Sequence, residues 1–152
     1  MEVIYRPIGV IHTSFNSVEE MPIQPTSDVS GPGIAEVSPA FTDALKDLEG
    51  FSHIYLLYHF HKVRQSQLMV TPFLDSKPHG IFATRAPSRP NPLGLSLVKL
   101  VRIENNLVYV EGVDVLNETP LLDIKPYVPD FDVRTGVRMG WYAARQAEAG
   151  KR

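Results

Sequence analysis

Short segments in which apolar residues recur at every second position constrain this chain more than any other feature of its sequence. The clearest segment runs from 53 to 61, where Ile54, Leu56, Tyr58 and Phe60 occupy alternate positions. In an extended strand these four side chains share one face, because successive side chains point to opposite faces. The same kind of pattern predicts further strands at 1–12, 33–37, 79–84, 95–103, 107–113 and 120–126. Asn105 and Asn106 form the predicted turn of a hairpin between two of these strands.

Helices are few by comparison. One is predicted at 39–48, where Phe41, Ala44, Leu45 and Leu48 would share a face. A weaker one is predicted at 136–149. Strands and helices do not alternate regularly, which argues against a Rossmann domain. We therefore expect a mostly β protein, a single-sheet β-barrel of about six to seven strands with one or two short helices, because closure removes exposed sheet edges.

The length of 152 residues fits one domain. The barrel is expected to occupy 1–135, and 136–152 is expected to form a C-terminal tail with helical character. The segment 14–32 has little apolar periodicity and contains three prolines, so it predicts a long loop. Loops of this length in compact domains are usually functional or mobile.

Composition excludes several classes of site. The chain has no cysteine, which excludes disulfides, thiolate metal sites and a cysteine nucleophile. Its longest apolar run, 54–58, is far shorter than the ~20 residues of a membrane-spanning helix, and the N-terminus lacks a secretory pattern. We expect a cytoplasmic protein with no membrane association. The formal net charge of −2 argues mildly against a large RNA-binding surface but permits a local basic patch.

The densest candidate for chemistry is the segment FATRAPSRPNPLGLS at 82–96. Three prolines restrict its backbone, so Arg85 and Arg89 would present their donors in a fixed geometry to a carboxylate or phosphate. The alternative is a structural turn whose arginines cap strand ends.

A second candidate is VDVLNETPLLDIKPY at 113–127. Asp114 follows a run of apolar strand residues, and Asp123 lies inside the apolar run 121–124. A carboxylate in such a place pairs with a cation or accepts backbone hydrogen bonds, since burying an unpaired charge is costly. A structural ion pair of Asp123 with Arg or Lys is the alternative to a catalytic role.

His59 and His61 would point to the same side of their strand, an arrangement that can bind a metal. No third ligand is evident, so a metal-dependent β-barrel hydrolase or oxygenase stays an alternative and no metal site is assigned. Glycine-rich nucleotide loops, the nucleophile elbow and the zinc-protease motif are all absent from the sequence.

Taken together, five stretches resemble the TsaA-like, or TrmO-like, family of tRNA methyltransferases. They are IGVIHTSF, MPIQP, LEGFSHIYLLYHFHK, GIFATRAPSRPNPLGLSLVKL and DVLNETPLLDIKPY, and they span nearly all of 8–127 in the order found in the family. The resemblance implies a homodimeric β-barrel enzyme that uses S-adenosylmethionine. Its implied reaction is methylation of the exocyclic nitrogen of threonylcarbamoyladenosine, beside the anticodon in the tRNA anticodon loop.

The resemblance also implies which residues hold the cofactor. The implied cofactor-binding positions are Gln24, Pro25, Thr26, His61, Lys62, Arg85, Leu97, Asp114, Val115, Leu116 and Asn117. Well-known bacterial members have Gly in place of Thr26 and Gln in place of Lys62. Those members also carry an additional C-terminal region that this chain largely lacks.

Roles for these positions follow as hypotheses from the chemistry of the cofactor. Asp114 would accept hydrogen bonds from the ribose hydroxyls or the ammonium, and Arg85 would bind the carboxylate. Leu97 and Leu116 would flank the adenine, whose edge would be read by the backbone of 115–117.

The reaction would need a base that accepts a proton from the substrate and residues that bind the substrate. The expected base is Asp123, or Tyr127 acting through water. Arg89, Asn91 and Lys125 are expected to bind the nucleotide or its phosphates. A SAM-binding module without catalysis is the remaining alternative.

Overall fold

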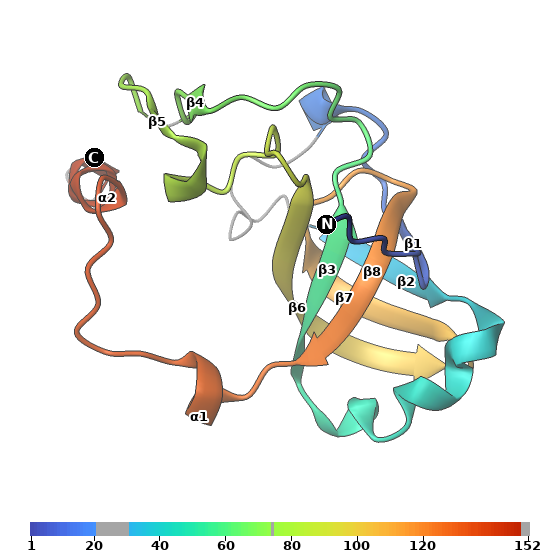
Figure 1. Cartoon of the computed structure of the whole chain (residues 1–152). Helices are drawn as coiled ribbons and strands as arrows, with labels where there is room; N and C mark the ends of the chain where they lie inside the picture. The colour runs from blue at the N-terminus through green and yellow to red at the C-terminus, as the bar shows by residue number, and fades with distance from the viewer. Residues whose placement is uncertain (21–30, 74, 150–152) are drawn as a thin grey trace.

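The computed structural model describes residues 1–20, 31–73 and 75–149, and its core is a closed barrel of six antiparallel strands (Figure 1). The strands are β1 (Gly9–His12), β2 (Gly31–Val37), β3 (His53–His59), β6 (Leu93–Glu104), β7 (Leu107–Val113) and β8 (Thr119–Pro126). They neighbour one another in the order β1-β2-β7-β6-β3-β8, and β8 pairs with β1 to close the ring. The predicted mostly β, single-sheet barrel is confirmed.

Smaller elements lie outside the barrel. Two short strands, β4 (Met69–Val70) and β5 (His79–Gly80), pair with each other only. The 3-10 helices are η1 (Val18–Glu20), η2 (Pro39–Leu45), η3 (Leu48–Gly50) and η4 (Ile81–Ala83), and the α-helices are α1 (Pro129–Asp132) and α2 (Tyr142–Ala149). No helix in the described ranges has the length and apolar character needed to cross a membrane.

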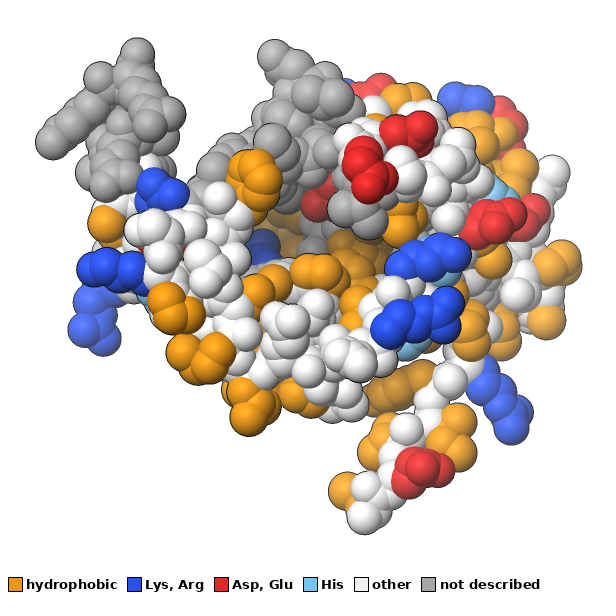
Figure 2. Space-filling view, turned by 90° about the horizontal axis from the view of Figure 1, so that it is seen from above, with side chains coloured by type: hydrophobic (Ala, Val, Ile, Leu, Met, Phe, Trp, Pro, Cys, Tyr) orange, Lys and Arg blue, Asp and Glu red, His pale blue; other side chains and the backbone are white. Residues whose placement is uncertain are grey.

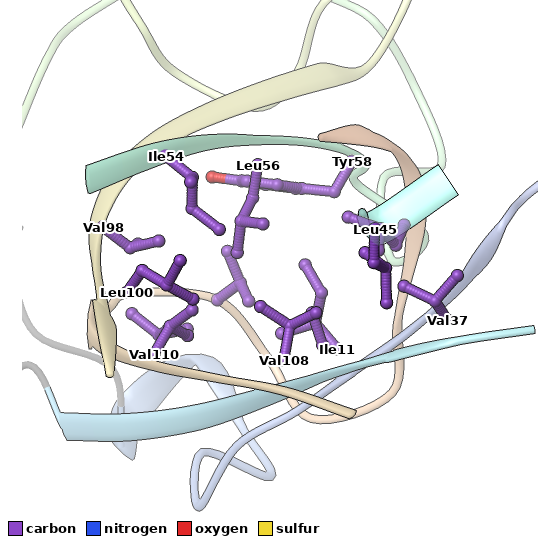
Figure 3. Close-up of a cluster of buried hydrophobic side chains, with 14 residues drawn as sticks. Ile11, Val37, Leu45, Ile54, Leu56, Tyr58, Val98, Leu100, Val108 and Val110 are labelled. Atoms are coloured by element: carbon purple, nitrogen blue, oxygen red, sulfur yellow. The ribbon is translucent and has the colours of Figure 1, made fainter. Parts of the chain in front are cut away.

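The inward side chains of alternate strand positions fill the barrel (Figure 3). Ile54, Leu56 and Tyr58 on β3 are all buried, as the period-two pattern of that segment predicted. They meet inward residues of the other strands, namely Ile11, Ala35, Val37, Val98, Leu100, Val108, Val110, Val113 and Leu121. Each fully buried aliphatic side chain contributes about 1.5–3 kcal/mol of burial free energy, so this interior is the main source of the barrel's stability.

Several predicted elements are shorter than the sequence pattern indicated. The strand predicted at 1–12 is formed only by Gly9–His12, and Val3, Ile4 and Tyr5 are exposed. The ladder to β8 begins where the Ile8 amide donates to the Leu121 carbonyl. The preceding Pro7 has no N–H with which to extend that ladder.

The segment at 79–84 was predicted with the wrong type of structure, and the helix predicted at 39–48 is shorter than expected and of the 3-10 form. Of this segment only His79 and Gly80 form a strand, and 81–83 form a 3-10 turn in which the Thr84 amide and hydroxyl both donate to the Ile81 carbonyl. The helix predicted at 39–48 is 3-10 over Pro39–Leu45. It ends at Lys46, whose ψ of 133° is not helical, and Asp47 follows with a φ of 68°. The helix predicted at 136–149 starts only at Tyr142, after Gly136 and Gly140 with positive φ.

Candidate functional site

One end of the barrel, here called the mouth, brings together three segments that are distant in the sequence. β3 ends there at His59, opposite the first residue of β6, Leu93, and β7 ends there at Val113. The segment after β3, the turn after β7 and the loop before β6 that contains Pro87, Pro90 and Pro92, here called the proline loop, therefore all leave the barrel at the same end (Figure 1). Seen from above, this end is hollowed and lined with apolar side chains, and basic side chains lie beside histidine on one rim (Figure 2).

A chain of two hydroxyls leads from the barrel interior to a carboxylate at the mouth. The Tyr58 hydroxyl lies 2.8 Å from Ser96 Oγ, which donates over 2.7 Å to Asp114 Oδ1. Tyr58 and Ser96 are buried and Asp114 is half-buried. Tyr58 passes over Gly94 of β6, where a Cβ would lie 2.1 Å from the Tyr58 ring. Glycine at this position is therefore what lets the ring reach Ser96.

Charges of both signs act on this group. Burial and, after it, the charge of Asp114 raise the pKa of Tyr58 to about 12, against the lowering effects of the Ser96 hydrogen bond and the charge of Arg85. The pKa of His61 is lowered, first by burial and then by the neighbouring charges of Lys62 and His59. His61 therefore favours its neutral form, which suits a site for a cationic ligand.

The turn 114–117 is fixed to the segment that follows β1. The Thr13 amide donates to Asn117 Oδ1 over 3.0 Å, and the Thr13 hydroxyl donates to the Val115 carbonyl over 2.9 Å. The Asn117 amide donates to the Phe15 carbonyl over 2.7 Å. Thr13 was not predicted as part of the site, although it lies in the stretch IGVIHTSF that resembles the family. These bonds engage the Asn117 side chain, so a ligand would meet other groups of the turn.

The two arginines of the proline loop have different environments. Nη1 of Arg89 donates to the carbonyls of Ile81, Thr84 and Ala86, at 3.1, 2.7 and 3.2 Å. This arginine therefore braces the loop, and the carbonyls it contacts belong to η4 and the loop and not to the strand ends that the structural alternative named. Arg85 is exposed at the same loop, and Asn91 is exposed beside the start of β6.

A second group of predicted residues lies on the outer face of the barrel. Leu97 of β6 pairs with Tyr55 of β3, and Tyr55 pairs with Lys125 of β8. Lys125 Nζ lies 3.2 Å from Asp123 Oδ2, so the ion pair weighed for Asp123 is present. The Tyr127 ring packs edge-on against Tyr55 with centroids 5.8 Å apart.

Tyr55 belongs to this outer group and was missed by sequence reasoning. Its pKa is raised by desolvation and by Asp132 and Tyr127, and it is lowered by Arg85. The charge of Arg85 thus lowers the pKa of Tyr55 as well as that of Tyr58. Of the remaining predicted residues, Leu116 is half-buried in the turn after β7, and Lys62 is exposed after β3. Gln24, Pro25 and Thr26 lie outside the described residues.

Two further features bear on alternative ligands. Within the described part of the chain, no cluster of three His, Asp or Glu side chains could hold a metal ion. An apolar groove lies at the opposite end of the barrel, beneath η2 and η3, where Phe41, Phe51 and Ile124 line it together with Asp123.

Comparisons with known proteins show what the whole chain is similar to. A family model described as the tRNA-methyltransferase O N-terminal domain matches residues 10–133. A probable S-adenosyl-L-methionine-binding protein of Pyrococcus abyssi is 52% identical over 139 residues, which are 91% of this chain and 76% of that protein. A tRNA (adenine(37)-N6)-methyltransferase of Rattus norvegicus is 34% identical over 137 residues, which are 86% of this chain and 32% of that protein.

Solved structures show the same similarity. The crystal structure of TrmO from Pseudomonas aeruginosa superposes with a TM-score of 0.76 at 36% identity, covering 93% of this chain and 63% of that one. A second crystal structure of TrmO gives a TM-score of 0.78 at 39% identity, covering 92% of this chain and 64% of that one. The chain thus spans just under two thirds of these solved chains and about a third of the rat relative.

Proposed function

The chain belongs to the family of the tRNA-methyltransferase O N-terminal domain, and from this premise we propose that it is an S-adenosylmethionine-dependent tRNA methyltransferase. Its proposed substrate is threonylcarbamoyladenosine beside the anticodon, and the methyl group goes to the exocyclic nitrogen. Because tRNA is the substrate, the proposed place of action is the cytoplasm.

The observation that carries the proposal is that the loop carrying Arg85 and the turn carrying Asp114 leave the barrel at the same end. Both charges act on Tyr58, although the two residues are far apart in the sequence. One is an acceptor for hydroxyl or ammonium donors, and the other is a donor for a carboxylate. S-adenosylmethionine offers a ribose diol, an ammonium and a carboxylate, so this donor set fits it.

When bound, S-adenosylmethionine supplies a methyl group on a positively charged sulfur. In our proposal Asp114 accepts from the ribose or ammonium, and Arg85 binds the carboxylate. Leu97 and Leu116 flank the adenine, and the neutral His61 adds no positive charge beside a cation. Catalysis then rests mainly on holding the reacting atoms about 3–3.5 Å apart and in line.

The outer face next to Leu97 is the proposed place of the substrate nucleotide. Asp123, or Tyr127 through water, takes the proton that the exocyclic nitrogen loses. Lys125 and Asn91 bind the nucleotide or its phosphates. Arg89 contributes the nitrogens that do not brace the loop. An anticodon-loop base is unpaired and can be splayed out, so no duplex has to be opened.

The distribution of charge supports an RNA substrate despite the net charge of −2. The segment 133–152 contains five Lys or Arg residues and one Glu, while the rest of the chain is acidic. Arg134 and Arg138 in this segment are exposed. A local basic segment of this kind attracts phosphates even when the whole protein is acidic.

A homodimer is proposed from the exposed apolar side chains of the barrel. Leu93, Leu95, Leu97 and Val101 on the outer side of β6 are each 45–51% exposed. A row of large apolar side chains on one strand is typical of a surface that contacts another chain. A second copy would cover these side chains and enclose the ligand position beside Leu97.

The decisive experiment is methyl transfer from labelled S-adenosylmethionine to tRNA prepared with and without the threonylcarbamoyl group. We expect label only in the modified tRNA. Label in neither tRNA, with the cofactor still bound, would favour a binding module without catalysis. Activity on another substrate that a chelator abolishes would instead favour metal chemistry at His59 and His61.

A further inference from the structure

We propose that Tyr58 and Ser96 are positioning residues that hold the Asp114 carboxylate in the orientation in which it binds the cofactor. The proposal rests on the proposed function, since it assigns Asp114 as an acceptor for S-adenosylmethionine. It adds two residues whose side chains do not reach the ligand and act only through Asp114.

The direction of the hydrogen bonds follows from the number of hydrogens available. An ionised carboxylate only accepts, so the hydrogen between Ser96 and Asp114 comes from the Ser96 hydroxyl. A serine hydroxyl has one hydrogen, so Ser96 can only accept from Tyr58. The chain therefore runs in one direction, from Tyr58 through Ser96 to Asp114. The chain ends on a single carboxylate oxygen, Oδ1, to which only Ser96 donates.

The packing around the two hydroxyls keeps them in place. Tyr58 is 4% exposed and Ser96 is 7% exposed, so water competes little for either hydroxyl. The Tyr58 ring lies over Gly94 and packs edge-on against Phe60 with centroids 5.5 Å apart. Since a buried hydroxyl without a partner is costly, each of the two residues holds the other in this arrangement.

As a consequence, the two carboxylate oxygens of Asp114 have different roles. Oδ1 is held from inside the barrel, and no described residue donates to Oδ2. A carboxylate fixed at one oxygen presents the other in a defined direction, without losing rotamer freedom when the ligand arrives. The chemical class that such an oxygen recognises is a hydroxyl or ammonium donor, as on the ribose or the amino-acid part of the cofactor.

A double-mutant cycle on S-adenosylmethionine binding tests the proposal. In calorimetry we expect Ser96→Ala and Asp114→Ala each to weaken binding by about tenfold or more, since a hydrogen bond to a charged group is lost. The double variant should bind no more weakly than Asp114→Ala alone, because Ser96 acts only through that carboxylate. Tyr58→Phe should weaken binding by a few-fold in the wild-type background and have no effect in the Ser96→Ala background.

The matched control is Val98→Ala, at the next inward position of β6, which is 2% exposed. It should lower the melting temperature and leave the dissociation constant within about twofold, because it removes packing without touching the hydroxyls. If the fold-losses of affinity of Ser96→Ala and Asp114→Ala multiply in the double variant, or if Ser96→Ala binds like the wild type, the positioning role is overturned. The proposed function is left standing in both cases. If Ser96→Ala does not fold, the cycle between Tyr58→Phe and Asp114→Ala decides in the same way. A wild-type protein that does not bind the cofactor would overturn both proposals.

Discussion

At the scale of single residues, Gly94 connects strand pairing to the candidate site. A methyl group there would lie 2.1 Å from a ring atom of Tyr58, well inside contact distance. We expect Gly94→Ala to displace the ring, break its hydrogen bond to Ser96 and destabilise the fold by about 1–3 kcal/mol. Thermal unfolding measures this loss. Gly80→Ala is the control, because its Cβ would meet nothing within 4 Å. Equal stability of Gly94→Ala and wild type would contradict the packing described for Tyr58.

Tyr58 also predicts how stability depends on alkaline pH. Its pKa is raised to about 12, mainly by burial, whereas an unfolded tyrosine has a pKa of about 10. Above pH 10 the unfolded chain loses this proton while the folded chain keeps it. The stabilising contribution is therefore complete below pH 10 and is lost as pH rises to 12.

Denaturant unfolding of wild type and Tyr58→Phe between pH 9 and pH 12 checks this expectation. The wild type should lose more unfolding free energy over this range than Tyr58→Phe does. Parallel curves for the two proteins would show that the hydroxyl does not titrate differently in the folded state.

At the scale of elements, Trp141 fixes the C-terminal helix to the loop region beside the barrel. Its Nε1 donates to the Ala83 carbonyl over 2.8 Å, and its ring stacks on His79 with centroids 4.7 Å apart. His79 is held in turn by Asp75, 2.6 Å away. The contacts join α2 to η4 and β5, at the top of the view in Figure 1.

We expect Trp141→Ala to release α2 while the barrel stays folded. Hydrogen exchange should become faster over 139–149 and stay unchanged in β3 and β6. Val137→Ala is the control, because that side chain is 60% exposed. Unchanged exchange over 139–149 in Trp141→Ala would show that other contacts hold the helix.

The elements also show which parts of the fold the sequence can predict. The alternation in 53–61, 95–103 and 107–113 gave strands with nearly their observed bounds, because a barrel buries every second residue. The pattern at 79–84 misled, because a hydroxyl-capped turn at Thr84 depends on local hydrogen bonds and not on periodicity. The 3-10 form of 39–45 and the glycines before α2 are decided by backbone angles, which a pattern of apolar residues does not reveal.

For the candidate site, the sequence predicted the segments that form it but not the side-chain links between them. Family resemblance identified the proline loop and the Asp114 turn, and the barrel brings them to one end. The links through Ser96, Tyr58 and Thr13 follow from which strands are neighbours, so they appear only in three dimensions. Arg89 illustrates the limit, since its residue type suits phosphate binding while its geometry braces a loop.

At the scale of the whole molecule, the basic C-terminal segment makes a prediction about RNA binding. Arg134 and Arg138 are exposed in an otherwise acidic chain. If each contacts one phosphate, the double variant Arg134→Gln, Arg138→Gln should reduce the slope of log affinity against log salt by about 1.4. Filter binding of tRNA from 50 to 300 mM salt measures it.

The control for this measurement is Lys46→Gln, an exposed lysine beside the groove at the opposite end of the barrel. It should leave the salt slope unchanged, and none of the three substitutions should alter S-adenosylmethionine binding. An equal slope for wild type and the double variant would place the RNA elsewhere on the surface.

The most direct test is a crystal structure of the chain with S-adenosylhomocysteine, the cofactor without its methyl group. We expect electron density for the ligand at the barrel mouth, with its ribose or ammonium on Asp114 Oδ2 and its carboxylate at Arg85. Density instead in the apolar groove beneath η2 and η3, at the far end of the barrel, would contradict the assignment of the site.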